Sequence, residues 1–220
     1  LGGNPELVAE EARSGSLGAE KTWTLWSFRV EGYVKNLSKI IQSGTFPRLY
    51  ENGGDGRGRG LEILLRRDLS QRWWGWLAYT LSKAERRRSD VTPYFPYDYD
   101  QPHMATVILS GRLGRLLRLG TKVRYSSGSP YTPVLGYDQT FKIVIPGEKN
   151  SARLPPYFRA DVRVEFREIT RKSTFSLYLE LLNVTGRRNV QGYIYDIERR
   201  KAETIHQIPF IPYLGVGIEF

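Results

Sequence analysis

The sequence predicts an all-β fold, an antiparallel up-and-down arrangement of about nine strands without a convincing helix. Three observations support this prediction. Apolar and polar residues alternate through most of the chain, the connections between the alternating segments are by turns short and long, and no run approaches the roughly 18 apolar residues of a membrane helix. Because a strand sends successive side chains to opposite faces, each segment has one apolar face and one polar face.

The clearest alternation lies in a predicted hairpin near the end of the chain, residues 158–181. Apolar residues recur at every second position from Phe158 to Phe166, and again from Phe175 to Leu181. The charged residues on the opposite face of this hairpin are Arg159, Asp161, Arg163, Glu165 and Glu180. In a membrane protein such residues would line a wet or plugged lumen, where opposite charges on neighbouring strands support the sheet.

The other strands follow from the same period of two. In chain order, the alternating segments are 16–20, 26–35, 61–66, 73–82, 105–110, 118–126, 158–166, 175–181 and 214–220. Residues 5–13 are interpreted as a loop that leads into the first strand.

The connections between these segments alternate in length. The short ones are 21–24, 68–71, 111–115 and 169–172, and the long ones are 38–55, 85–102, 127–155 and 196–202. Outer-membrane barrels have short periplasmic turns and long extracellular loops, so this order predicts a meander with all long loops at one end. A Greek-key sandwich gives no reason for it.

Composition is compatible with a membrane barrel and does not by itself exclude a soluble protein. The net charge is +10, aromatic residues make up 13%, and cysteine is absent. Mean hydropathy is −0.44, which is low enough for a soluble protein but also suits a barrel in which only alternate residues face lipid. Aromatic residues near both strand ends, Trp23, Trp73 and Phe220 at one and Tyr79 and Tyr125 at the other, resemble two interfacial girdles.

The residues predict neither an enzyme nor a metal or cofactor site. His103 and His206 are the only histidines, and no nucleophile motif accompanies the carboxylates. The segment from Tyr97 to His103 holds possible oxygen and imidazole ligands, but a polar network at the base of a loop explains it better. Nucleic acid is not expected as a partner, because the cations alternate with apolar residues and form no single patch.

Two loop features are candidates for binding. The long loops contain Tyr94, Tyr97, Tyr99 and Tyr131, whose aromatic rings suit contacts with a small-molecule ligand. The basic run Arg86–Arg88, preceded by Lys83, lies where a strand leaves the predicted membrane. It suits either the anionic headgroups of lipopolysaccharide or a solvated loop.

Several short motifs, in their order and spacing, resemble the C-terminal part of the transmembrane β-barrel of TonB-dependent outer-membrane receptors. They are Asn4–Glu6 leading into Leu17–Glu20, Gly58–Glu62, Tyr79–Ala84, Tyr97-Asp98 with Asp100–His103, Ser127-Gly128 with Pro130–Pro133, Arg153–Tyr157 with Asp161–Arg163, and Leu182–Thr185. The chain then ends on Phe220, the terminal aromatic residue typical of proteins folded by the outer-membrane insertion machinery.

The resemblance implies that residues 1–220 form the C-terminal segment, about nine strands, of a barrel of about 22 strands. It further implies a bacterial outer-membrane receptor for TonB-dependent uptake of a siderophore, cobalamin or oligosaccharide. The implied partners are outer-membrane lipid and lipopolysaccharide, the protein's own plug domain, the TonB energising complex and the ligand. Neither the plug nor the TonB-contacting segment has a counterpart in these residues.

Two other functions remain open from the sequence. One is a passive outer-membrane porin without a plug. The other is a soluble all-β binding module, in which Phe158, Val162, Leu177 and Val216 would pack together in a core between two sheets.

Overall fold

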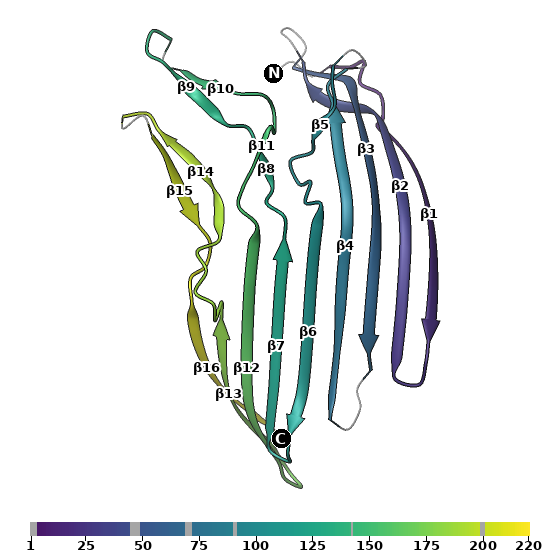
Figure 1. Ribbon diagram of the computed structural model, residues 1–220, viewed down its shortest axis with the longest axis vertical. Coiled ribbons are helices and arrows are strands. Elements are labelled where there is room, and N and C mark those ends of the chain that lie inside the picture. Colours follow the sequence, from purple (N-terminus) through teal and green to yellow (C-terminus); the bar gives the residue numbers. More distant parts are fainter. Residues whose placement is uncertain (1–3, 45–48, 69–71, 90–91, 142, 199–200) are drawn as a thin grey trace.

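One long antiparallel sheet dominates the computed structural model, which describes residues 4–44, 49–68, 72–89, 92–141, 143–198 and 201–220 (Figure 1). Its strands follow the path β1-β2-β3-β4-β6-β7-β12-β13-β16, and β5 also pairs with β4. The strands of the path are β1 (Glu11–Thr22), β2 (Trp26–Ser43), β3 (Tyr50–Arg67), β4 (Trp73–Arg87), β6 (His103–Leu113), β7 (Leu117–Ser126), β12 (Tyr157–Ile169), β13 (Thr174–Leu182) and β16 (Ile211–Glu219). The predicted all-β, up-and-down fold and its nine strands are therefore confirmed.

The connections lie at two distinct ends of the sheet. Residues 23–25, 114–116 and 170–173 form short turns at the lower end in Figure 1. The longer connections gather at the upper end and carry the short strands β5 (Phe95–Pro96), β8 (Pro130–Tyr131), β9 (Val134–Asp138), β10 (Ile143–Pro146), β11 (Ala152–Arg153), β14 (Val190–Asp196) and β15 (Lys201–His206). We call this upper end the loop end.

The predicted long loop at 38–55 is wrong, because strands occupy most of it. β2 continues to Ser43 and β3 begins at Tyr50. Sequence alternation is lost there because the register shifts between Leu37 and Ile41, and Lys39 has a φ of 58°. At roughly 3.3 Å per residue, each of these 18-residue strands is about 60 Å long.

The other long connections contain more structure than the sequence predicts. The last one, placed at 196–202, in fact runs from 183 to 210 and folds into the β14–β15 hairpin. The connection of 127–156 pairs β9 with β10 and β8 with β11. These hairpins escape prediction because their strands are short and no sustained apolar alternation marks them.

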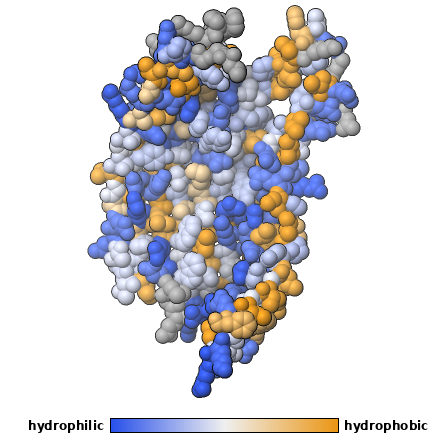
Figure 2. Space-filling model, turned by 180° about the vertical axis from the view of Figure 1, so that it is seen from behind, coloured by the Kyte–Doolittle hydropathy of each residue, from blue (hydrophilic) through white to orange (hydrophobic). Residues whose placement is uncertain are grey.

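Strand register brings the apolar residues onto one continuous face of the sheet. Directly paired residues share a face, and one such row runs Phe28, Leu65, Leu77, Val107, Val123 and Ala160 across six strands. We call this the apolar face. The face that carries Arg159, Asp161 and Arg163 is the charged face, and hydrophilic residues are widespread on the side of the molecule shown in Figure 2.

No second layer covers the apolar face within the described residues. Ile40 is the one buried hydrophobic residue there, whereas Leu177 is 39% exposed and Val216 61%. The two-sheet core required by a soluble module is therefore not formed, and this alternative is wrong for the part of the chain that the structure describes. No helix in that part is long and apolar enough to cross a membrane.

Aromatic side chains mark both borders of the apolar face. Near the short turns, Trp26 meets Trp73 edge to face with ring centroids 5.9 Å apart, and the Arg67 guanidinium lies 3.6 Å from the Trp73 ring. Toward the loop end, Tyr79 and Tyr125 stand on the same face, each paired with Ala105. The Tyr79 hydroxyl is hydrogen-bonded to His103 Nδ1 at 2.8 Å. Such borders are typical of strands that cross a bilayer.

Candidate functional site

The loop end is held together by an ion pair between two distant connections, in which the carboxylate is buried and the guanidinium is partly exposed. Asp100, only 3% exposed, pairs with Arg153, and its Oδ1 accepts a hydrogen bond of 2.6 Å from the backbone N–H of Ala84. Arg153 Nη1 also donates to the carbonyl oxygens of Asp100 at 2.7 Å and Gly128 at 3.2 Å. These contacts join the 88–102 connection to both ends of the 127–156 connection.

Gly128 permits the close chain approach on which this junction depends. A Cβ at this position would lie 1.6 Å from the carbonyl oxygen of Leu154, which is backbone and cannot move aside as a side chain would. A glycine therefore fits where any other residue would clash.

A second polar cluster lies beside the ion pair. Asn150, 3% exposed, donates from Nδ2 to Asp98 Oδ1 at 2.6 Å and to the carbonyl oxygen of Pro96 at 2.8 Å. Lys149 Nζ lies 2.9 Å from the same Asp98 oxygen. The segment from Tyr97 to His103 is thus part of a hydrogen-bonded network, and no three metal-ligating side chains gather in the described residues.

The hydrogen bond from Asn150, and after it the one from Lys149, lowers the pKa of Asp98. A lowered pKa means that this carboxylate stabilises the fold above the ordinary Asp range, near pH 3.9, and that the contribution disappears as pH falls through the lowered value. We expect Asp98→Asn to loosen the 127–156 connection at neutral pH, with the difference from wild type vanishing in acid. Protease cleavage within this connection, followed against pH, measures it; a difference independent of pH would contradict the assignment.

The predicted loop tyrosines lie in different surroundings. Tyr94 packs on the guanidinium groups of Arg57 at 4.0 Å and Arg87 at 5.0 Å from its ring centre. Tyr97 lies under Arg86 at 4.1 Å and meets Tyr99 edge to face at 5.5 Å. Tyr99 is 78% exposed. Tyr94 and Tyr97 therefore have arginine partners, whereas Tyr99 presents most of its ring to solvent.

Tyr131 lines a pocket between two of the loop hairpins. Its ring centre lies 5.1 Å from that of Tyr193 on β14, and the pocket encloses about 410 Å³. Its lining residues are Tyr131, Thr132, Pro133, Val134, Leu135, Gly136, Tyr193, Tyr195 and Ala202. We call it the aromatic pocket. Tyr193 and Tyr195 were not anticipated from the sequence, although their spacing of two puts them on one face of β14.

The five charged residues predicted to share a face do so. Arg163 is paired with Glu180 in register, with their charged groups 3.6 Å apart, and its guanidinium lies 3.7 Å from the Tyr178 ring. Glu165 is paired with Tyr178.

Asp161 has a structural role within this set. It is 9% exposed and accepts hydrogen bonds from Arg159 Nε at 2.6 Å and from the backbone N–H of Asn183 at 2.9 Å. Asn183 is fully buried with a φ of 54°, a conformation that asparagine tolerates better than most residues. Asp161 and Asn183 thus fix the bend at which the chain leaves β13 for the loop end.

Phe220 follows β16 at the short-turn end and is fully exposed.

Solved structures similar to this chain include three receptors named for siderophores or their iron complexes. The chain superposes on the ferric-catecholate import receptor Fiu of E. coli K12 with a TM-score of 0.67 and 14% identity, covering 98% of this chain and 28% of Fiu. The siderophore receptor PiuA of Acinetobacter baumannii superposes with a TM-score of 0.67 and 14% identity, covering 94% of this chain and 28% of PiuA. The ferripyoverdine receptor of Pseudomonas aeruginosa superposes with a TM-score of 0.68 and 13% identity, covering 91% of this chain and 26% of that receptor.

At these identities the likeness concerns the fold, and the chain spans less than a third of each of these proteins. No curated protein sequence matches it. The family model described as "TonB dependent receptor-like, beta-barrel" matches residues 1–184, most of the chain. The chain therefore belongs to the family of TonB-dependent receptor-like β-barrels.

Proposed function

We propose that this chain is the C-terminal segment of a bacterial outer-membrane barrel that imports a scarce nutrient with energy supplied through TonB. The family is one of outer-membrane receptors and transporters. The observation that best supports the proposal is the continuous apolar face, which no second layer covers in the described residues. In this proposal that face meets lipid, the charged face lines the lumen beside a plug domain of the same protein, and the protein has no catalytic role.

The proposed ligand is an anionic iron–siderophore complex. Fiu is named as a ferric-catecholate import receptor, PiuA as a siderophore receptor, and the third as a ferripyoverdine receptor. The net charge of +10 favours an anionic ligand. The loop end would be extracellular, and Tyr131, with Tyr193 and Tyr195, would contact the ligand in the aromatic pocket. Tyr99 would contact it through its exposed ring. Tyr94 and Tyr97 would hold the loop positions through their arginine partners.

Energy dependence separates this function from that of a passive porin. Cells that carry the full-length protein as their one receptor should take up radiolabelled iron bound to a catecholate siderophore, and loss of TonB or an uncoupler should abolish uptake. Uptake that persists without TonB would instead indicate a porin. Cell fractionation should place the protein in the outer membrane.

The aromatic pocket gives a sharper prediction. Tyr131→Ala and Tyr193→Ala should each raise the siderophore concentration for half-maximal binding about tenfold, since a buried aromatic anchor contributes on the order of 1.4 kcal/mol. Tyr137→Ala is the matched control, because Tyr137 lies on β9 outside the pocket lining. Equal binding by all three variants would exclude the pocket as the ligand site.

A further inference from the structure

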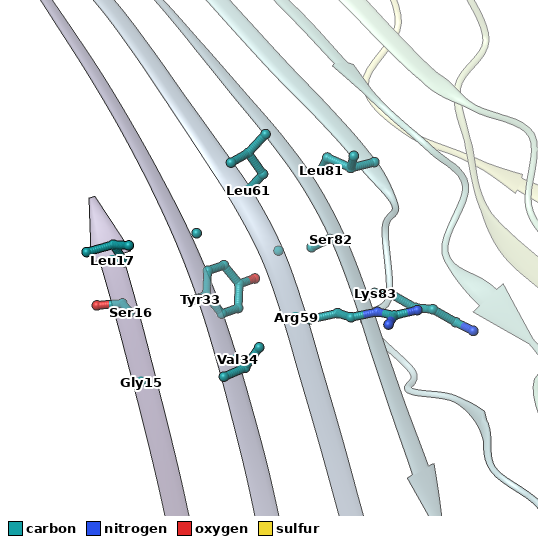
Figure 3. A pocket seen from close by; sticks show the side chains of 12 residues that line it. Gly15, Ser16, Leu17, Tyr33, Val34, Arg59, Leu61, Leu81, Ser82 and Lys83 are labelled. Atoms are coloured by element: carbon teal, nitrogen blue, oxygen red, sulfur yellow. The ribbon is translucent and has the colours of Figure 1, made fainter. Parts of the chain in front are cut away.

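A shallow hollow on the apolar face of β1–β4 has the two-part chemistry of an amphiphile site. It encloses about 730 Å³ and lies where the apolar face gives way to charged residues (Figure 3). Its walls include Leu17, Val34, Leu61 and Leu81, and Figure 3 shows Arg59 and Lys83 together at one end.

Two glycines create the hollow. In register, Gly32 lies between Leu17 and Leu61, so a residue without a side chain is flanked by two leucines. One row nearer the loop end, Gly15 is paired with Val34. A Cβ at Gly15 would meet nothing within 4 Å, and one at Gly32 would meet just the Gly60 carbonyl oxygen, at 4.0 Å. The floor is therefore open, and an alkyl chain could lie against backbone between the leucines.

The charged end has an excess of cations. Arg59 and Lys83 are directly paired on β3 and β4, next to the Leu61–Leu81 pair. The Glu85 carboxylate forms ion pairs with Lys83 Nζ at 2.8 Å and with Arg57 Nε at 2.7 Å, so two cations share one negative charge. Arg59 makes no ion pair among the described residues. Arginine and lysine together at an apolar boundary suit a phosphate group.

We propose that this hollow binds a phosphorylated lipid of the outer leaflet, lipopolysaccharide, with a phosphate between Arg59 and Lys83 and an acyl chain over Gly32. The proposal rests on the outer-membrane placement proposed above. Charge complementarity selects an anion, and the apolar walls directly beside the cations select a lipid rather than a free ion.

Titration of the purified full-length protein in detergent with bisphosphorylated lipid A, with bound lipid counted by native mass spectrometry, tests the proposal. The double variant Arg59→Gln with Lys83→Gln removes the phosphate partners, and Gly32→Leu fills the floor. Each should weaken lipid A binding about tenfold. The control Arg118→Gln with Lys122→Gln removes the same charge from the charged face and should bind within about twofold of wild type.

Unchanged binding by the double variant would overturn the proposal. Displacement of lipid A by an equal concentration of inorganic phosphate would also overturn it, because the site would then hold a free anion. Folding of Gly32→Leu is judged by its gel shift on heating. If this variant does not fold, the wild-type protein is instead titrated with dephosphorylated lipid A, which should bind about tenfold more weakly than bisphosphorylated lipid A. The outcome is independent of iron uptake, so a protein that holds lipid A without importing iron would refute the proposed transport and retain this site.

Discussion

Asp100→Ala is expected to destabilise the protein by about 1–3 kcal/mol, the usual cost of leaving a buried hydrogen-bonding group without its partner. The change leaves the Arg153 guanidinium without its carboxylate and the Ala84 N–H without its acceptor. Because the pair joins the 88–102 and 127–156 connections, both should become sensitive to protease. Unfolding of the full-length protein in urea, together with mapping of the cleavage sites, measures both effects.

Glu148→Ala is the matched control, since Glu148 is an exposed carboxylate in the same 127–156 connection. Its effect should stay within about 0.5 kcal/mol, as for most surface substitutions. Arg153→Ala should cost more than Asp100→Ala, about 3–5 kcal/mol, because it leaves the Asp100 carboxylate charged and buried. If Asp100→Ala unfolds at the wild-type urea concentration, the pair does not anchor the loop end.

Leu109→Arg is expected to cost about 2–4 kcal/mol of stability in lipid, the range for arginine near the bilayer midplane on a barrel's lipid face. Leu109 is 44% exposed on the apolar face, and its register partners are Gly75 and Thr121. The measurement is urea unfolding of the full-length protein folded into phosphatidylcholine vesicles.

Ser110→Arg is the matched control, because it places an arginine at the next position of β6, on the charged face. Ser110 is paired there with Gly120, and both line a small hollow of about 170 Å³. Charged side chains of both signs also line it, namely Lys122, Asp161, Arg163 and Glu180, so an arginine there lies among polar groups. Its effect should stay within about 0.5 kcal/mol. An equal cost at the two positions would mean that the faces do not meet different surroundings.

The sequence predicts the strands well where lipid would impose a pattern, and poorly beyond it. From Phe158 to Phe166, every second residue must be apolar, so the strand can be read directly from the chain. Beyond the apolar face no such requirement exists. The ends of β2 and β3 and the whole of β15, which is exposed on both faces, therefore lack a signal although they pair regularly.

The candidate site shows the same limit. A polar network around Tyr97–His103 could be predicted from its side chains, but its partner Arg153 lies 53 residues after Asp100. The pairing of β8 with β11 places Arg153 beside Pro130, and the hydrogen bond from the Ala84 N–H holds Asp100 at the end of β4. Likewise, Tyr131 could be selected as an aromatic loop residue, whereas its contact with Tyr193 depends on the β14–β15 hairpin, which the sequence did not reveal.

The central claim is that the apolar face meets lipid and the charged face does not. The chain has no cysteine, so single cysteines can be placed along β12 of the protein in vesicles and labelled with a fluorophore that brominated lipid tails quench. We predict quenching at Ala160, Val162 and Val164 and none at Arg159, Arg163 and Glu165. Quenching at the second set with none at the first, or equal quenching at both, would contradict the account.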